Sequence, residues 1–425
     1  MSTKPTNSFL SASAVFLASN VLAAATPFVL LPILTRYLSP AEYGQVAIYQ
    51  ALVIGLAAII GISADSAAGV KYYDSHITQT ELKNYIGSCV VVLLATGGFT
   101  LLFVAVFLRR ISDWLALGEQ WVPLSIAVAS ANLVVSLRMV QWQVRNKPRN
   151  FGMFKVSQSV LNMLVSLLLV IGFSLGSQGR ILAMSLVPIA YAILALVLLR
   201  QDGLLGFAYR GDHIREIVTY GVPLIPHSIG YFLLSSVDRF VINDKLGTAP
   251  VGMYMVAVQL VSASGLVFDA INSAYVPWLF ERLKRNDGQE KREIVRRTLG
   301  YFLFLVVVAV LAFPIGGRVL VLVAGERYAA AGPVVGWLAL GWAFYGMYLM
   351  VTNYIFFSKR TGLLSASTIL AGMINVGLLL ALVPHMGIIG AGIAFAISSG
   401  VKFAMTWYVS QLRFPMPWFS FRSNV

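Results

Sequence analysis

Charged and amide side chains recur at helical spacing inside apolar runs of this chain. The fullest set is Lys155, Gln158 and Asn162, with Ser159 and Ser166 beside them. Steps of three and four residues place such side chains on one face of a helix. An ammonium group flanked by amides in an apolar segment is suited to hold an anionic group, because charges interact strongly where water is scarce.

Two further cations lie inside apolar runs. Arg138 is followed by Gln141 and Arg145, and Lys402 lies between Ser398 and Thr406 at steps of four. These cations could bind the same kind of anion as Lys155. Long cationic side chains can instead extend to a membrane surface and contact lipid headgroups, and the sequence leaves both interpretations open.

Carboxylates at the ends of two apolar runs suggest ion coupling. Asp65 and Asp269 occupy roughly equivalent places in the two halves of the chain. Either could carry a proton if burial favours the protonated form, or could pair with a neighbouring cation. We therefore predict no cofactor, with proton or sodium coupling as the candidate energy source.

A third group of charges lies at the opposite ends of the apolar runs. Arg36 follows the first run, and Asp238 and Arg239 follow the seventh. These residues could form a gate on the outer side, or an ion pair that fixes the ends of helices.

Enzyme chemistry has little support in the sequence. No phosphate-binding loop, nucleophile elbow or metal-ligand spacing is present, and the four histidines are scattered. The single cysteine, Cys89, excludes an intramolecular disulfide. We predict that the chain is not an enzyme and binds no metal.

Composition identifies the elements that position these residues. Apolar residues make up 58% of the chain and charged residues 11%, and the mean hydropathy is +0.79. Soluble domains carry about 25% charged residues, so this chain has too little charge for a soluble surface. Long apolar runs predict an all-α polytopic membrane protein.

About twelve transmembrane helices are predicted, each near the ~20 residues that cross a bilayer. Their approximate ranges are 12–34, 43–64, 86–108, 119–141, 151–173, 181–199, 220–242, 251–273, 299–323, 333–357, 362–383 and 387–409.

The positive charges predict the orientation. Of the 31 Lys and Arg residues, 20 fall in segments on the N-terminal side of the membrane, eight on the other side and three within spans. Positive residues concentrate on the cytoplasmic side, which places both termini in the cytoplasm. The net charge of +14 therefore reflects topology and attraction to anionic lipids, and no nucleic-acid motif accompanies it.

An internal repeat predicts the domain organisation. The segment LSPAEYGQVAIYQ (residues 38–50) is similar to a second segment, LGTAPVGMYMVAVQ (246–259), at an offset of 208 residues. Each segment predicts a turn followed by the start of a helix. We predict a six-helix bundle over residues 1–200, a cytoplasmic linker over 201–219, and a second six-helix bundle with a tail over 220–425. Parallel repeats of this kind occur in transporters.

Two signature regions carry a family resemblance. The segments PFVLLPILTRYLSPAEYGQVAIYQ and YGVPLIPHSIGYFLLSSVDRFVINDKLGTAPVGMYMVA resemble the O-antigen flippases (Wzx) of the multidrug/oligosaccharidyl-lipid/polysaccharide exporter superfamily. The resemblance covers essentially the whole chain. It implies two bundles like those of multidrug exporters, around a cavity that opens alternately to each side.

The resemblance also implies a cargo, which is an undecaprenyl-pyrophosphate-linked oligosaccharide moved to the periplasmic leaflet of the bacterial inner membrane. Its pyrophosphate and sugars cannot cross hydrocarbon unaided. Arg138, Lys155 and Lys402 would receive the pyrophosphate, and a face formed by Tyr345, Tyr348 and Thr352 could contact sugars. Implied partners are the lipid-linked glycan, anionic lipids and other polysaccharide assembly proteins.

Three alternatives remain. One is an ion-coupled multidrug exporter of the same superfamily, although its cavity would favour carboxylates over the cations found here. Another is a peptidoglycan-precursor flippase, which commonly has extra helices. A membrane polymerase or glycosyltransferase would need a long outer loop or an acidic cluster, and the sequence has neither.

Overall fold

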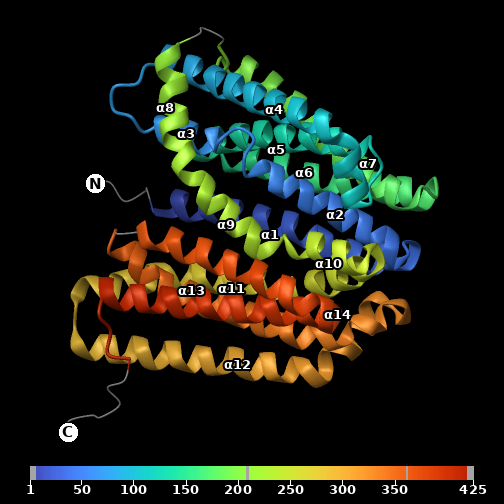
Figure 1. The fold of residues 1–425 in the computed structure, drawn as a ribbon. Helices are drawn as coiled ribbons and strands as arrows, with labels where there is room; N and C mark the ends of the chain where they lie inside the picture. Colours follow the sequence, from blue (N-terminus) through green and yellow to red (C-terminus); the bar gives the residue numbers. More distant parts are fainter. Residues whose placement is uncertain (1–5, 207–209, 360–361, 419–425) are drawn as a thin grey trace. The chain divides into compact units, whose positions relative to one another are not determined.

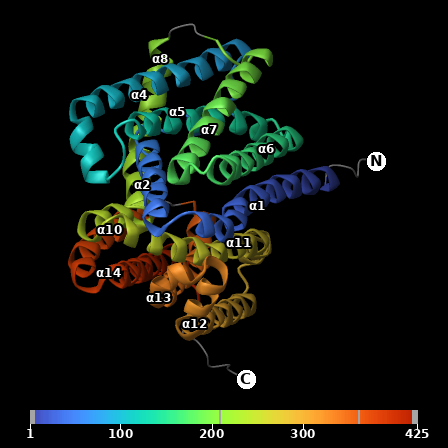
Figure 2. The same cartoon turned by 90° about the vertical axis from the view of Figure 1, so that its right-hand side faces the viewer.

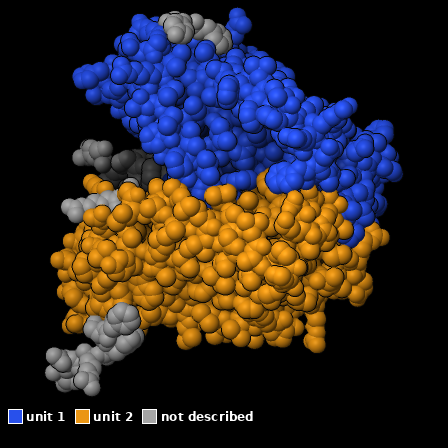
Figure 3. All heavy atoms as spheres, viewed as in Figure 1, with its two compact units in different colours: residues 1–232 blue, residues 233–425 orange. Residues whose placement is uncertain are grey.

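The computed structural model describes residues 6–206, 210–359 and 362–418, with the side chains described from residue 12 onwards. Every regular element in these ranges is a helix (Figure 1), which confirms the predicted all-α fold class. Contacts divide the chain into two compact units, Met1–Phe232 and Leu233–Val425, coloured separately in Figure 3. The predicted division at residues 200 and 220 is not tested by this and stays a prediction.

The described part of the first unit contains nine α-helices, of which α9 crosses the boundary, a short π-helix (η1) and a short 3₁₀-helix (η2). They are α1 (Thr6–Tyr37), α2 (Pro40–Ala57), α3 (Ala64–Lys71), α4 (Gln79–Leu115), α5 (Trp121–Val144), α6 (Pro148–Leu167), η1 (Leu168–Gly172), α7 (Gly176–Gln201), α8 (Gly211–Gly221), η2 (Val222–Leu224) and α9 (Ile225–Ser235). Within this unit α5 packs against α2, α3, α4, α6 and α7, and α1 packs along α6 (Figure 2). The central helix is therefore α5.

The second unit is built around α13. Its elements are α10 (Asp238–Leu246), α11 (Thr248–Arg285), α12 (Gly288–Ala324), η3 (Glu326–Ala331), α13 (Gly332–Phe357) and α14 (Gly362–Arg413). Helix α13 packs against α11, α12 and α14. Among the candidate spans, α5 and the span ending in α13 are the most buried, so each unit has one central helix.

Ten helices among the described residues are long and apolar enough to cross a membrane. The predicted span over 43–64 falls on α2, which is not among the ten. Two other predicted spans both fall on α14, where Gly387 has a φ of 60° and interrupts the helix. A Cβ on Gly390 would lie 2.6 Å from the Leu382 oxygen, so the two limbs approach closely at this bend. The count of twelve and the orientation stay predictions.

The two copies of the repeated segment begin helices at matching positions. Helix α2 begins at Pro40 and α11 at Thr248, which confirms the predicted helix starts. Ser39 caps α2 by accepting a hydrogen bond from the Glu42 N–H, and the Glu42 carboxylate accepts from the Ser39 N–H at 2.8 Å. This reciprocal arrangement satisfies two donors that would otherwise lack partners at the helix start.

After these starts the two halves differ. Helix α2 ends at Ala57 and a turn separates it from α3, whereas α11 continues to Arg285. Gly61, Ile62 and Ser63 all have left-handed φ angles, of 77°, 50° and 52°. This conformation is uncommon for a β-branched residue such as Ile62. The turn is held from outside, because the Gly61 N–H donates to the Thr96 hydroxyl at 2.9 Å.

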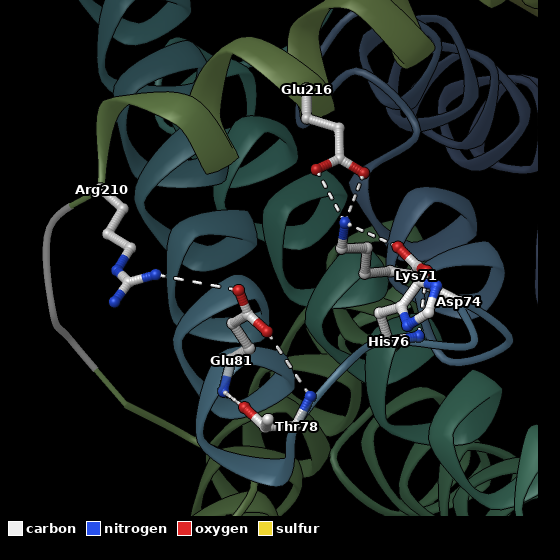
Figure 4. A network of polar contacts seen from close by, with 7 residues as sticks. All are labelled: Lys71, Asp74, His76, Thr78, Glu81, Arg210 and Glu216. Atoms are coloured by element: carbon white, nitrogen blue, oxygen red, sulfur yellow. Dashed lines mark hydrogen bonds and ion pairs between the residues drawn. The ribbon is translucent and has the colours of Figure 1, made fainter.

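Helix α8, within the predicted linker, lies against this turn and against α3 and α4. Lys71 Nζ is 3.0 Å from Glu216 Oε1, and Arg210 Nη1 is 3.9 Å from Glu81 Oε1 (Figure 4). The His213 and Tyr85 rings lie 5.4 Å apart. Exposed ion pairs add little stability, so ring packing and the burial of Ile217 hold α8 in place.

We expect Gly221→Ala to lower the stability of the protein. A Cβ at this position would lie 1.9 Å from the backbone oxygen of Ile62, so α8 would have to move away from the turn. Overpacking of this kind costs about 1–3 kcal/mol. The melting temperature of the purified protein in detergent measures the loss. Gly211→Ala in the same helix is the matched control, because nothing lies within 4 Å of its Cβ; equal losses in both variants would contradict the prediction.

Candidate functional site

Lys155 lines a cavity of about 390 Å³ within the first unit. The walls come from α1, α5 and α6, and their polar side chains are almost all neutral. Besides Lys155, the polar lining consists of Asn20, Asn132, Ser136, Gln143 and Gln158. Phe16 and Phe151 add an aromatic edge, with their ring centroids 5.0 Å apart. The cavity therefore combines one cation with amides and aromatic surface.

The Lys155 ammonium has a neutral hydrogen-bond partner. Its Nζ donates to Asn20 Oδ1 at 2.5 Å and lies 5.6 Å from the centroid of the Phe151 ring. Among the described residues, no carboxylate oxygen lies within 4 Å of Lys155 Nζ. The positive charge of this cavity is thus not neutralised by an ion pair and remains available to an anion.

The predicted polar stripe divides between two places. Gln158 lines the cavity together with Lys155. Asn162 does not line it, because its amide donates to the Ala183 oxygen at 3.0 Å and its Oδ1 accepts from Arg180 Nη1 at 2.7 Å. The sequence interpretation assigned Arg180 to a short connection and missed this cluster, which also includes a hydrogen bond from Arg180 to Ser166.

Arg138 lies apart from the Lys155 cavity. Its side chain is 2% exposed, and its Nη2 is 2.5 Å from Asp202 Oδ2 at the end of α7. The guanidinium carbon lies 4.1 Å from the centroid of the Trp142 ring. The structure thus pairs Arg138 with a carboxylate and does not bring it to the cavity lining. A role for Arg138 in receiving cargo stays a prediction.

Lys402 is a buried cation of the second unit. The residue is 9% exposed, and its Nζ lies 4.2 Å from the centroid of the Tyr348 ring. In the described residues no carboxylate lies within 4 Å of this nitrogen, and the buried Ser398 and Thr406 hydroxyls beside it have no hydrogen-bond partner. Groups of this kind bind water, ions or substrate in membrane proteins.

Asp269 is connected to Lys402 through aromatic rings. The Tyr345 hydroxyl donates to Asp269 Oδ1 at 2.8 Å, and the Tyr345 and Tyr348 rings stack with centroids 6.2 Å apart. Asn353 donates to Asn272 at 2.8 Å nearby on the same two helices. The predicted tyrosine face of α13 therefore contacts Asp269 of α11 through Tyr345 and Lys402 of α14 through Tyr348. Thr352 bonds its own helix, at the Tyr348 oxygen.

Asp65 lies close to the Lys155 cavity without lining it. Its Oδ2 accepts a hydrogen bond of 2.5 Å from Ser136, which is a lining residue. Asp65 and Asp269 thus both accept from a hydroxyl group, one in each unit.

The predicted gate residues have separate environments. Arg36 is exposed at the end of α1. Asp238 and Arg239 are buried neighbours at the start of α10, with Arg239 Nη1 at 2.8 Å from Asp238 Oδ1. Arg239 also donates to the Ser235 oxygen. This pair therefore joins the end of α9 to the start of α10, and the gate stays a prediction.

Sequence reasoning missed Asn20 and Gln143 in the cavity lining. Asn20 lies in the apolar run of α1, and an amide in such a run is a signal of its own. No group of three or more His, Cys, Asp or Glu side chains suited to a metal occurs in the described residues.

Comparisons with known proteins give relatives of similar length. The chain is 25% identical over 395 residues to an uncharacterized membrane protein of Haemophilus influenzae, covering 90% of this chain and 94% of that protein. It is 23% identical over 398 residues to the probable low-salt glycan biosynthesis flippase Agl15 of Haloferax volcanii, covering 90% of this chain and 79% of the relative.

Solved structures share the fold at low sequence identity. The lipid II flippase MurJ in its inward closed conformation gives a TM-score of 0.72 at 13% identity, covering 95% of this chain and 87% of that one. An inward-facing multidrug resistance MATE family transporter of the MOP superfamily gives 0.63 at 15% identity, covering 93% and 94%. Where function is named, these proteins are flippases and transporters rather than enzymes, as the sequence predicts.

Residues 9–283 match the family described as polysaccharide biosynthesis protein. The match covers both signature regions and well over half of the chain. This match shows that this multi-pass membrane protein belongs to the polysaccharide biosynthesis protein family.

Proposed function

We propose that this chain is a flippase that moves an undecaprenyl-pyrophosphate-linked oligosaccharide of the O-antigen type across the bacterial inner membrane. The headgroup would pass from the cytoplasmic to the periplasmic leaflet by alternating access. Family membership and the name of the Haloferax relative support transport of a lipid-linked glycan. The observation that carries the proposal is the Lys155 cavity, which offers one uncompensated cation among amides.

The chemistry of the cavity fits a pyrophosphate with attached sugars. The ammonium group would hold a phosphate oxygen, and Asn132, Gln143 and Gln158 offer donors and acceptors for sugar hydroxyls. Phe16 and Phe151 present apolar ring surface to sugar C–H groups. The Lys155 ammonium would repel a cationic drug in this cavity, which disfavours a multidrug exporter.

A complementation experiment tests the proposal. A strain that lacks its own O-unit flippase would receive this gene, and surface polysaccharide and lipid-linked intermediate would be measured. Restored polymer with a falling intermediate is the expected result. Rescue of a strain depleted of its lipid II flippase, without rescue of O-unit export, would instead assign a peptidoglycan precursor as cargo. Failure in both backgrounds, tested with several glycans at verified membrane expression, would contradict the proposal.

The energy source we propose is the membrane potential together with a coupling cation. A potential of 100 mV changes the energy of one charge by about 2.3 kcal/mol, and an inside-negative potential drives an anionic headgroup outward. We propose that one of the two carboxylates, Asp65 or Asp269, carries the proton, because each accepts a hydroxyl hydrogen bond that protonation would alter.

We expect either Asp65→Asn or Asp269→Asn to remove the response of export to an imposed pH gradient, because an amide cannot carry the proton. The measurement is the rate of headgroup translocation in vesicles, with and without the gradient, at a clamped potential. The variant at the non-coupling site serves as the control for the other. If both variants keep the wild-type response, neither carboxylate couples protons, and a dependence on sodium in the same vesicles would replace this prediction.

A further inference from the structure

The first unit contains a second cavity, of about 510 Å³, that shares no lining residue with the Lys155 cavity. It lies between the α3–α4 connection, the α5–α6 connection and the end of α7. Its polar lining includes Tyr72, Thr78, Gln79, Arg145, Lys147 and Asp202. The predicted orientation places all of these connections on the cytoplasmic side.

The carboxylates of this second cavity are already paired. Asp74 Oδ2 lies 3.3 Å from Lys71 Nζ (Figure 4), and Asp202 Oδ2 lies 2.5 Å from Arg138 Nη2. The hydrogen bond from the His76 N–H, followed by that from Lys71, lowers the pKa of the Asp74 carboxyl. Each carboxylate thus lies at ion-pair distance from a cation outside the cavity lining, and Lys71 is shared with Glu216.

The cations of the second cavity are not paired in this way. Within the described ranges no carboxylate oxygen lies within 4 Å of the side-chain nitrogens of Arg145 or Lys147. Arg145 packs on Tyr72, with the guanidinium carbon 4.9 Å from the ring centroid, and its buried Nε has no hydrogen-bond partner there. Arg145 and Lys147 are therefore the two lining cations of this cavity that have no carboxylate at ion-pair distance.

The start of α4 borders this cavity, and the Glu81 carboxylate that caps it offsets part of the positive end of the helix. The helix is 37 residues long, and Thr78 caps it through reciprocal hydrogen bonds with Glu81. The N-terminus of a helix carries about half a positive charge. Gln79, the first helical residue, lines the cavity. An arginine fork, a lysine and a helix start are the donors that bind phosphate oxygens in proteins.

We propose that this cavity binds the phosphate ester of an anionic headgroup on the cytoplasmic side, at a site separate from the proposed transport path. Arg145, held against Tyr72, would bind two phosphate oxygens, and Lys147 would neutralise the remaining charge. Thr78 and Gln79 offer polar groups to a polyol attached to the phosphate. A bound headgroup would connect the α3–α4 connection, the α5–α6 connection and the end of α7.

The test uses the purified full chain in a neutral detergent, with three probes. These are dioctanoyl phosphatidylglycerol, glycerol 3-phosphate and zwitterionic dioctanoyl phosphatidylcholine, and the readouts are saturable binding and the rise in melting temperature. The expected result is saturable binding of the phosphatidylglycerol, weakened about tenfold by Arg145→Gln and by Lys147→Gln. Equal binding of glycerol 3-phosphate would assign a soluble phosphate ester as the ligand.

Arg149→Gln is the matched control, because it removes one charge from the first turn of α6, two residues after Lys147, and does not line the cavity. It is expected to bind like the wild type. Lys147 is exposed, so Lys147→Gln keeps the test valid if Arg145→Gln fails to fold. The proposal is overturned if no phosphate probe binds saturably, if phosphatidylcholine binds as well as phosphatidylglycerol, or if Arg149→Gln weakens binding as much as the two lining variants. None of these results depends on flippase activity.

Discussion

Lys155→Ala is expected to reduce export of lipid-linked glycan by roughly ten- to a hundredfold at equal membrane expression. A hydrogen bond to a charged group contributes about 1.5–3 kcal/mol, which corresponds to that range. The alanine would leave a cavity with amides and aromatic rings but no positive charge to receive the pyrophosphate. The measurement is the ratio of surface polymer to accumulated lipid-linked intermediate in the complemented strain.

Three further variants make this prediction specific. Lys155→Arg keeps the charge and is expected to retain most of the export. Asn20→Ala removes the acceptor that orients the ammonium at 2.5 Å, so we expect a smaller loss, of about threefold. Lys284→Ala removes a lysine from an exposed position of α11 and is expected to have no effect. Wild-type export by Lys155→Ala would remove the cavity cation from the mechanism.

The second large effect is expected from Asp202→Asn, which would leave the Arg138 guanidinium without its counter-charge. Removing one partner of a buried ion pair costs about 3–5 kcal/mol. Asp202 is 39% exposed, so water can replace part of its charge and we expect the lower end of this range. The readout is the melting temperature of the purified protein in detergent, together with its level in the membrane.

A double variant tests whether the loss of stability in Asp202→Asn comes from the unpaired Arg138 charge. Arg138→Met with Asp202→Asn removes both charges and is expected to be more stable than Asp202→Asn alone, because methionine can pack on Trp142 without a buried charge. Glu281→Gln is the surface control, since the pair of Glu281 with Arg285 is exposed and contributes little. A melting temperature of Asp202→Asn equal to that of the control would show that Arg138 does not need its partner.

Hydropathy and repeat spacing predicted much of the fold, because membrane helices can be recognised in a sequence by their length and apolar composition. The starts of α2 and α11 followed from one repeated segment. The turn over residues 58–63 could not be predicted, since its sequence, AIIGIS, is as apolar as the helix before it. Only Gly61 hints at a break, and the contacts that hold it come from Thr96 and Gly221, far along the chain.

The candidate site was predicted in part for a geometric reason. Helical spacing put Lys155 and Gln158 on one face, and they do line one cavity. Asn162 shares the face but lies about 10 Å further along the axis, where it meets Arg180 of α7. Periodicity gives the direction of a side chain and not the neighbour it reaches. The pairing of Arg138 with Asp202 was hidden for the same reason, as was the contribution of Asn20.

In a chain with an internal repeat, one half can replace the other only if both copies adopt the same local structure. Here the first copy carries a bent segment with three consecutive left-handed residues, and the second carries an uninterrupted helix of 38 residues. A chimera made from two copies of the second half would place a straight rod where α2 and α3 now bend, with no counterpart of Thr96 or Gly221 beside it. The two halves therefore match at their helix starts and differ after residue 57, so the segment over residues 58–63 cannot be replaced by its counterpart in the second half.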